Sequence, residues 1–287
     1  MVVNYLTKNF RKYYFLLFSS FLLLIFPNIA SSVPLEELFY TGRAIPFYGA
    51  AQTEKQAGLL RGFQETKLAE RMAQLTNETI KLRQDLQIGF ISCGAPNAFF
   101  KSDRNAIVIC VEMVELIIDE AKKDKDVAGK WNPQQIFRAL NGALWGIFFH
   151  ELAHAVTKIN RIAITGREED VADQFIVYYA INFVESKDVS VIFPTIWFFD
   201  RLAQSSLITS ANQEDIKRIL ADEHSLNGQR IYNLACWALG GKSKDGNYSA
   251  NFVNLPLERG NRCQSEYSTL NRAFIANFSK YFKISKY

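Results

Sequence analysis

The feature that most constrains this chain is a long apolar segment that carries two histidines near its end. It begins with Asn132 followed by Pro133, which are residue types favoured at the cap and the first position of a helix. From there to about Lys158 the segment is rich in apolar side chains, and it includes ALWGIFF and then HELAH at 150–154. We therefore expect one long and largely buried helix against which the rest of the fold packs.

The two histidines of this segment, His150 and His154, are four residues apart. Four residues turn a helix by about 400° and advance it by about 6 Å, so both imidazoles lie on one face and can bind one zinc ion. Glu151 lies about 100° further round, where its carboxylate can reach a metal-bound water as a general base. The alternative is a helix with two hydrogen-bonded core histidines, but burying Glu151 without a task is costly.

A third zinc ligand is expected from GREEDVADQF at 166–175, where a second helix begins near Arg167. Glu169 and Asp173 are four residues apart and share one helix face. We expect Glu169 to bind the metal and Asp173 to accept a hydrogen bond from a ligand histidine, which fixes the tautomer of that histidine. Glu168 is the rival ligand, and an acidic first turn that only caps the helix dipole is the simpler alternative.

The third histidine of the chain, His224, is preceded by two acidic residues. Hydrolysis of a peptide bond needs a hydrogen-bond donor for the oxyanion of the tetrahedral intermediate, and His224, Arg230 and Tyr232 are candidates. We expect His224 to be the catalytic donor, with Asp222 to orient it. A purely structural histidine is the other interpretation.

The N-terminus has the pattern of a secretory signal peptide, in which basic residues precede the apolar run at 13–26 and small residues follow it. We expect a signal peptide at 1–32 and a single domain at 33–287, with its core at about 64–270. The alternative is a membrane anchor at 13–30, which is close to the shortest length that spans a bilayer. Both predict export: a periplasmic or secreted protein, or one anchored and facing outside the cytoplasm.

The charge of the body excludes one class of partner. The formal net charge is +4, and three of the positive charges lie in the first 32 residues, where no acid occurs. The remaining chain is nearly neutral, which gives no electrostatic basis for binding nucleic acid. We expect a peptide or protein as partner, and contact with a membrane only through residues 13–30.

Four cysteines lie in the expected mature chain: Cys93, Cys110, Cys236 and Cys263. An even number in an exported chain favours two disulfides. We favour Cys93 with Cys110 and Cys236 with Cys263, because each pair joins neighbours in the sequence. Buried free thiols are the alternative.

The rest of the pattern predicts more helices and a small sheet near the N-terminal side. We expect helices at about 64–81, 112–123, 195–205, 212–222, 227–239 and 263–281, strands at 86–92 and 106–111, and irregular chain at 33–52, 93–103 and 240–256. The segment 106–110 is either a buried strand or a cleft edge to which a peptide adds by backbone pairing. The predicted fold class is α+β, mainly helical, with the small sheet next to the helix that holds HELAH.

HELAH followed by EDVAD resembles the HExxH…ExxAD pattern of the gluzincin metallopeptidases, which include the membrane-associated CAAX-prenyl and heat-shock proteases. The chain as a whole is similar to a family of exported bacterial metallopeptidase-like proteins that form a domain of unknown function. That likeness rests on the blocks CGAPNAFF (93–100), HELAHA (150–155), GREEDVADQF (166–175), DEHSLNGQRIYNLACWALG (222–240) and ERGNRCQSEY (258–267). It implies a gluzincin-like core, with His150, His154 and Glu169 on zinc and Glu151 as the base, but no particular substrate.

The sequence therefore predicts a zinc-dependent metallohydrolase, a metallopeptidase in which Glu151 assists attack of a zinc-bound water on a peptide bond. An amidase acting on cell-wall peptides would use the same site, and a membrane-anchored interaction protein is a further possibility. The main alternative is a catalytically idle zinc-binding domain that acts as a binding module. A structural zinc site is usually closed by a fourth protein ligand, and the sequence shows none near these motifs.

Overall fold

The computed structural model describes residues 39–124, 132–184, 190–205 and 221–283, together with Glu214 and Lys217. The chain divides into two compact units, Met1–Tyr40 and Thr41–Tyr287, and the description below concerns the second. The expected leader at 1–32 and most of the helix expected at 212–222 lie outside the described residues. Within the described part of the chain, no helix has the length and apolar character needed to cross a membrane.

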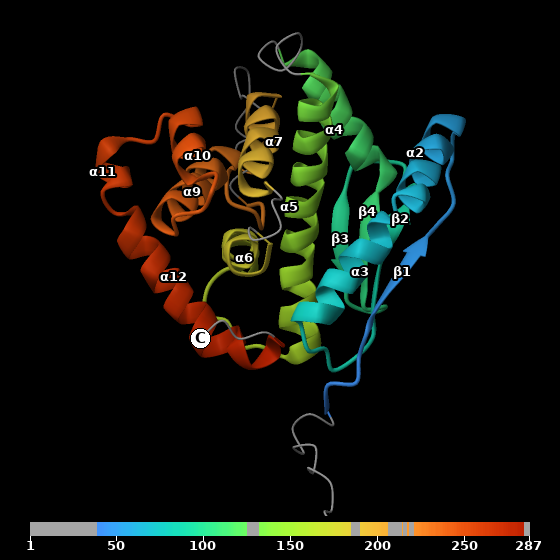
Figure 1. Cartoon of the computed structure of the whole chain (residues 1–287), viewed down its shortest axis with the longest axis horizontal. Coiled ribbons are helices and arrows are strands. Elements are labelled where there is room, and N and C mark those ends of the chain that lie inside the picture. The colour runs from blue at the N-terminus through green and yellow to red at the C-terminus, as the bar shows by residue number, and fades with distance from the viewer. Residues whose placement is uncertain are drawn as a thin grey trace, which may run out of the picture. The chain divides into compact units, whose positions relative to one another are not determined.

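The second unit is mainly helical with one small sheet, as predicted. Its strands are β1 (Ala44–Tyr48), β2 (Leu86–Ile91), β3 (Ala98–Lys101) and β4 (Ala106–Cys110). Its helices are α2 (Glu54–Glu65), α3 (Leu68–Thr79), α4 (Val111–Lys123), α5 (Pro133–Asn160), α6 (Glu168–Tyr179), α7 (Ile192–Ser205), α9 (Asn227–Gly240), α10 (Gly246–Phe252), α11 (Leu257–Gly260) and α12 (Cys263–Phe278). A π-helical turn, Ala180–Val184, follows α6, and a short 3-10 turn, Ser279–Tyr281, follows α12. Figure 1 shows α5 between the sheet and the group of helices that includes α6, α7 and α9.

Helix α5 is the scaffold of the fold. Its start is fixed by a capping box, in which the Asn132 side chain accepts a hydrogen bond from the Gln135 backbone N–H, and the Gln135 side chain accepts one from the Asn132 N–H. It ends where Arg161 takes a left-handed conformation with φ of 55°. Because α5 contacts β3 and β4 as well as α6 and α7, side chains along it lie between the two halves of the fold.

The sheet has the order β1-β2-β4-β3, in which β1, β2 and β4 are parallel and β3 is antiparallel to β4. Every residue of β4 is buried, as its AIVIC sequence suggests. The possibility that 106–110 forms a cleft edge is wrong, because β4 has a partner on both sides. The edge next to it is β3, at residues 98–101, which we expected to be part of a loop.

Three other segments differ from the secondary structure that the sequence predicted. The segment at 33–52 holds β1, which tolerates Pro46 because it is an edge strand that needs fewer ladder hydrogen bonds. The helix expected at 64–81 is interrupted at Lys67, whose φ of 52° separates α2 from α3. Near the C-terminus, the stretch at 240–256 contains α10 rather than only loop.

Helices α5 and α7 approach each other very closely at two glycines. A Cβ atom added to Gly146 would lie 1.8 Å from Oγ1 of Thr195, and one added to Gly142 would lie 2.4 Å from the carbonyl oxygen of Ser190. Thr195 is fully buried. The two glycines are four residues apart, so they share the α5 face on which α7 packs.

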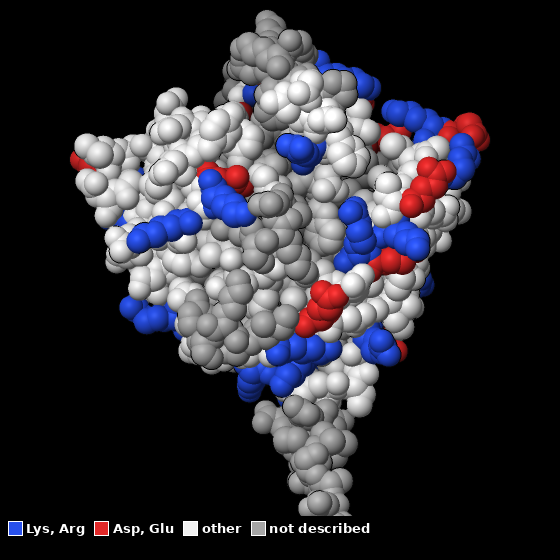
Figure 2. All heavy atoms as spheres, in the orientation of Figure 1, with Lys and Arg blue, Asp and Glu red and all other residues white. Residues whose placement is uncertain are grey.

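Charged side chains are spread over the surface of the second unit. On the face shown in Figure 2, scattered Lys and Arg side chains lie among fewer Asp and Glu side chains on a largely uncharged surface. No continuous basic stripe crosses the face shown.

Candidate metal centre

The structure places His150 and His154 on one face of α5, with their Nε2 atoms 3.3 Å apart. Both imidazoles lie at the buried side of the helix, with side chains 6% and 13% exposed. Two imidazole nitrogens this close, on adjacent turns of one helix, could both bind a single ion.

Helix α6 brings Glu169 to these two nitrogens. Its carboxylate oxygens lie 2.9 Å from Nε2 of His150 and 3.4 Å from Nε2 of His154. Glu169 stands in the first turn of α6, and α6 packs against α5. The three residues predicted to bind the metal are therefore brought together.

The far sides of both imidazoles face carboxylates from the same helix. Nδ1 of His150 lies 3.0 Å from Oδ1 of Asp173, which is one turn beyond Glu169. Nδ1 of His154 lies 2.9 Å from Oε1 of Glu168. Glu168, the rival ligand, thus stands behind the His154 ring, a position that the sequence did not reveal. A carboxylate that accepts the Nδ1 proton fixes the tautomer in which Nε2 has a lone pair for a metal.

A third helix completes the support of Asp173. Arg230 in α9 donates from Nε to Oδ2 of Asp173 at 2.8 Å and from Nη2 to Oδ1 at 2.7 Å. Its guanidinium lies 4.0 Å from the centre of the Phe199 ring of α7. Arg230 was a candidate oxyanion donor, but it is buried and bound to Asp173. Tyr232 lies two residues further along α9, about 200° round the helix, and is 40% exposed.

The third histidine also reaches the centre. Nε2 of His224 lies 2.8 Å from Oε2 of Glu169, and its ring stacks on that of His150 with 5.8 Å between centroids. Nδ1 of His224 lies 3.2 Å from Oδ1 of Asp222, which also accepts the backbone N–H of His224. All three histidines of the chain therefore surround one carboxylate, and Asp222 lies where it can orient His224.

The segment that carries His224 is fastened to the start of α6. Arg167 donates to the carbonyl oxygen of Asp222 at 3.1 Å and to that of Glu223. The Ser225 hydroxyl donates to Oδ1 of Asp170 at 2.8 Å. These contacts explain how His224, which is 74 positions beyond His150 in the sequence, comes to lie beside it.

Glu151 lies buried between α5 and the edge strand β3. The backbone of Phe100 acts to lower the pKa of its carboxylate, and Glu151 is 7% exposed. Burial raises the pKa of Glu151 above its ordinary value, although His150 and His154 act in the opposite direction. A carboxylate with a raised pKa is suited to accept and return a proton.

The charges of the histidines and of Glu169 depend on one another. Burial opposes the charging of His150, but its contacts with Asp173 and Glu169 outweigh burial and raise its pKa to about 9. Burial likewise acts to raise the pKa of Glu169, but hydrogen bonds from His150, His154 and His224 hold that pKa far below its ordinary value. A metal that binds here must displace the imidazole protons that face Glu169.

The donor atoms fit a zinc ion. The set consists of imidazole Nε2 atoms and one carboxylate, which are ligands that zinc prefers, and the Nδ1 atoms are already committed to carboxylates. The ligand atoms of His150, Glu169 and His224 all lie within 4.8 Å of one another. A cavity of about 640 Å³ adjoins them. It is lined by His154, Arg167, Glu168, Glu169, Asp222 and Glu223.

Residues 48–276 match the model of a protein family described as "Putative metallopeptidase". The chain belongs to this metallopeptidase family. No curated protein matches the chain, and no solved structure matches it. The family membership agrees with the resemblance drawn from the sequence blocks, and the match includes both helices that carry the metal centre.

Two disulfides brace this member of the metallopeptidase family. They join Cys93 to Cys110 and Cys236 to Cys263, which are the neighbouring pairs favoured above. The second disulfide ties α9 to the start of α12. Because α9 also carries Arg230, it fixes the helix behind the metal centre.

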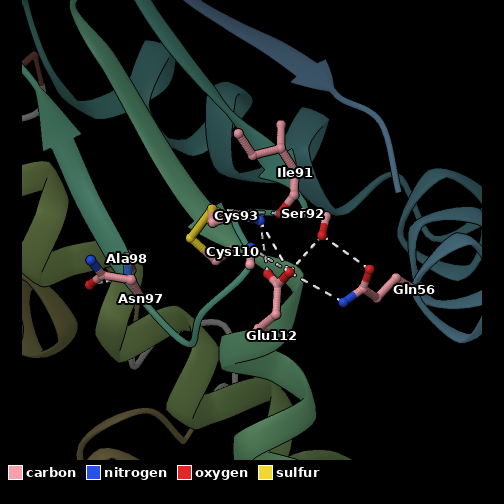
Figure 3. Close-up of a disulfide and its surroundings, with 9 residues drawn as sticks. Gln56, Ile91, Ser92, Cys93, Asn97, Ala98, Cys110 and Glu112 are labelled. Carbon is pink, nitrogen blue, oxygen red and sulfur yellow. Dashed lines mark hydrogen bonds between the residues drawn. A yellow bond between two sulfur atoms is a disulfide. The ribbon is translucent and has the colours of Figure 1, made fainter. Parts of the chain in front are cut away.

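The first disulfide lies beside a buried carboxylate (Figure 3). Glu112 accepts hydrogen bonds from the backbone N–H groups of Cys93 and Gly94 and from the Ser92 hydroxyl. Burial acts to raise the pKa of Glu112, but these bonds lower it to about 2. The two cysteines near Glu112 are bonded to each other and cannot act as thiolate ligands. The cluster instead fixes the loop that leads into β3.

Proposed function

We propose that the chain is a zinc-dependent metallopeptidase in which His150, His154 and Glu169 hold the ion and Glu151 is the general base. The observation that carries the proposal is the convergence of the histidine Nε2 atoms on Glu169, 2.9 and 3.4 Å from its oxygens. Carboxylates behind both imidazoles support the same interpretation, because a structural core histidine needs no such arrangement. The family membership supports peptide hydrolysis.

The mechanism follows from the position of Glu151. A zinc ion, when bound, supplies Lewis acidity that lowers the pKa of a water and polarises a carbonyl group. Glu151 follows the ligand His150 by one residue, so its carboxylate is placed to take the proton of an attacking water. The raised pKa of Glu151 allows the same carboxylate to deliver that proton to the leaving amine.

The edge strand β3 supplies a place for a peptide. The N–H of Cys110 donates to the carbonyl oxygen of Asn97, so alternate residues of β3 bond to β4, and the backbone groups of Ala98 and Phe100 face away from it. The outward N–H of Ala98 donates to Oδ1 of Asn97, so a peptide at this edge would pair with the outward carbonyl oxygens. Strand β3 packs against α5, the helix that carries Glu151, and the backbone of Phe100 acts on the Glu151 carboxylate. A substrate paired with this edge would therefore lie beside the general base.

A second candidate function is an idle zinc-binding module. The observation that favours it is His224, because a fourth donor atom near Glu169 is typical of a closed structural site. The buried Glu151 favours the enzyme, because a closed site needs no base and burial of a carboxylate is costly.

Export is part of the proposal. Disulfides persist in oxidising compartments, and both pairs of cysteines are joined. Together with the leader-like N-terminus, they support a periplasmic or secreted enzyme, with an uncleaved anchor as the alternative. Extraction with and without detergent distinguishes the two forms.

The test is cleavage of an unfolded protein such as casein, and of cell-wall peptides, by the full chain loaded with zinc. We expect wild type to cleave, and the matched variant Glu151→Gln to bind zinc but to cleave at least about a hundredfold more slowly, because a general base contributes that much. Equal cleavage by both proteins would refute the role of Glu151. Loss of zinc from Glu151→Gln would show that Glu151 is a ligand instead.

A further inference from the structure

The three imidazoles of the chain are connected in the same way. Each Nδ1 lies next to a carboxylate: 3.0 Å in His150, 2.9 Å in His154 and 3.2 Å in His224. Each Nε2 points at Glu169, at 2.9, 3.4 and 2.8 Å. The pattern that marks the first two as ligands is thus present a third time.

The setting of His224 differs from that of the other two in one respect. His150 and His154 stand on a buried helix, whereas His224 stands on residues 222–225, outside regular structure, with 41% of its side chain exposed. Apart from the contact of His224 itself with Glu169, this segment, which we call the latch, is held to the start of α6 through the side chains of Arg167 and Ser225 among the contacts described for it. Such exposed hydrogen bonds are individually weak.

We propose that His224 is a fourth metal ligand of the resting protein, and that the latch must move away before a substrate can use the site. The inference rests on the proposed function and concerns how access to the same site is regulated. Four protein ligands complete a tetrahedral zinc site and leave no position for a water. The resting protein is therefore inhibited, and it cleaves only while the latch is open, although Glu151 is in place throughout.

The donor count is tested directly by nuclear magnetic resonance on the full chain, with histidine labelled with spin-active nitrogen and spin-active cadmium added in place of zinc. The chain has only three histidines, so His150→Gln, His154→Gln and His224→Gln variants assign every imidazole signal. We expect a scalar coupling between cadmium and Nε2 of all three. Couplings to His150 and His154 but not His224 overturn the latch and leave the proposed function intact. Absence of bound cadmium overturns both.

The latch itself is tested by the binding of acetohydroxamate, a small metal chelator, to the cobalt-loaded chain. We expect His224→Ala to bind it at least about tenfold more tightly than wild type, since removal of the latch abolishes the need to open a site that is open about a tenth of the time or less. Arg167→Gln, which keeps His224 but loosens its segment, should shift binding in the same direction. If His224 serves only as an oxyanion donor, its removal leaves binding equal or weaker, and the latch is refuted.

Discussion

The Arg230–Asp173 pair behind the metal centre gives a prediction that can be worked out from the structure. Asp173 is 4% exposed and accepts both hydrogen bonds of the Arg230 fork, in addition to its contact with His150. The substitution Arg230→Met keeps an apolar side chain against Phe199 but removes the cation. Asp173 is then left buried with one partner in place of two.

The expected cost is set by this stranded carboxylate. Removal of one partner of a buried ion pair costs about 3–5 kcal/mol, and the lost cation–π contact with Phe199 contributes about 0.5–2 kcal/mol of that range. Because His150 still faces Asp173, we expect a value near the lower end, about 3 kcal/mol. For a body of this size that lowers the melting temperature by about 6–12 °C.

The assay is urea unfolding of the metal-free chain, followed by circular dichroism. The control is the double variant Arg230→Met with Asp173→Asn, which leaves no uncompensated charge and should be less destabilised than the sum of the two single variants. The pKa of Asp173 is held below its ordinary value of 3.8 despite burial, chiefly by Arg230. The contribution of ionised Asp173 to the free energy of unfolding is therefore present above pH 3.8 and is lost as the pH falls. In Arg230→Met, the free energy of unfolding should fall less over this pH range. A cost below about 1 kcal/mol, or strict additivity in the double variant, would refute the reasoning.

Three further predictions concern the scaffold. Gly146→Ala should destabilise the chain by about 2 kcal/mol in thermal unfolding, because its Cβ meets Thr195. Gly146→Ala with Thr195→Ala should recover only part of the loss, because the Oγ1 contact is removed but the Cβ of residue 195 stays 2.9 Å away. Glu112→Gln should cost about 2 kcal/mol near neutral pH. The Glu112 contribution is present above its unfolded pKa of 4.5 and is lost as the pH falls through about 2, so unfolding curves of variant and wild type should converge in that range. Cys93→Ser with Cys110→Ser should cost about 3 kcal/mol by opening a loop of 17 residues, without change in metal content.

The sequence predicted those parts of the fold that depend on local signals. Helix α5 has a cap and a long apolar pattern, and its spacing alone placed His150 and His154 on one face. Strand β1 was missed because its partner is distant in the sequence: the register joins Ala44 to Leu86. Strand β3 was missed because it has only four residues, although it pairs with β4, the next strand in the sequence. Local composition around them, with proline and glycine nearby, favoured loops.

In the metal centre, too, the sequence predicted what depends on local spacing and missed what depends on how the helices pack. Glu169 and Asp173 were found because they are four residues apart on one helix, whereas the contact of Glu168 with His154 depends on how α6 packs on α5. Arg230 was named only as one of three candidate oxyanion donors, since nothing in its local sequence shows that α9 brings it to Asp173. The scarcity of histidine was a usable signal, because the third one also reaches the centre.

The measurement that tests the central claim most directly is the metal content of the full chain purified from an oxidising compartment. Elemental analysis should find about one zinc per chain in wild type and in Glu151→Gln, and much less in Glu169→Ala. Correctly folded wild-type protein that binds no zinc, or a Glu169→Ala variant that retains it, would contradict the account.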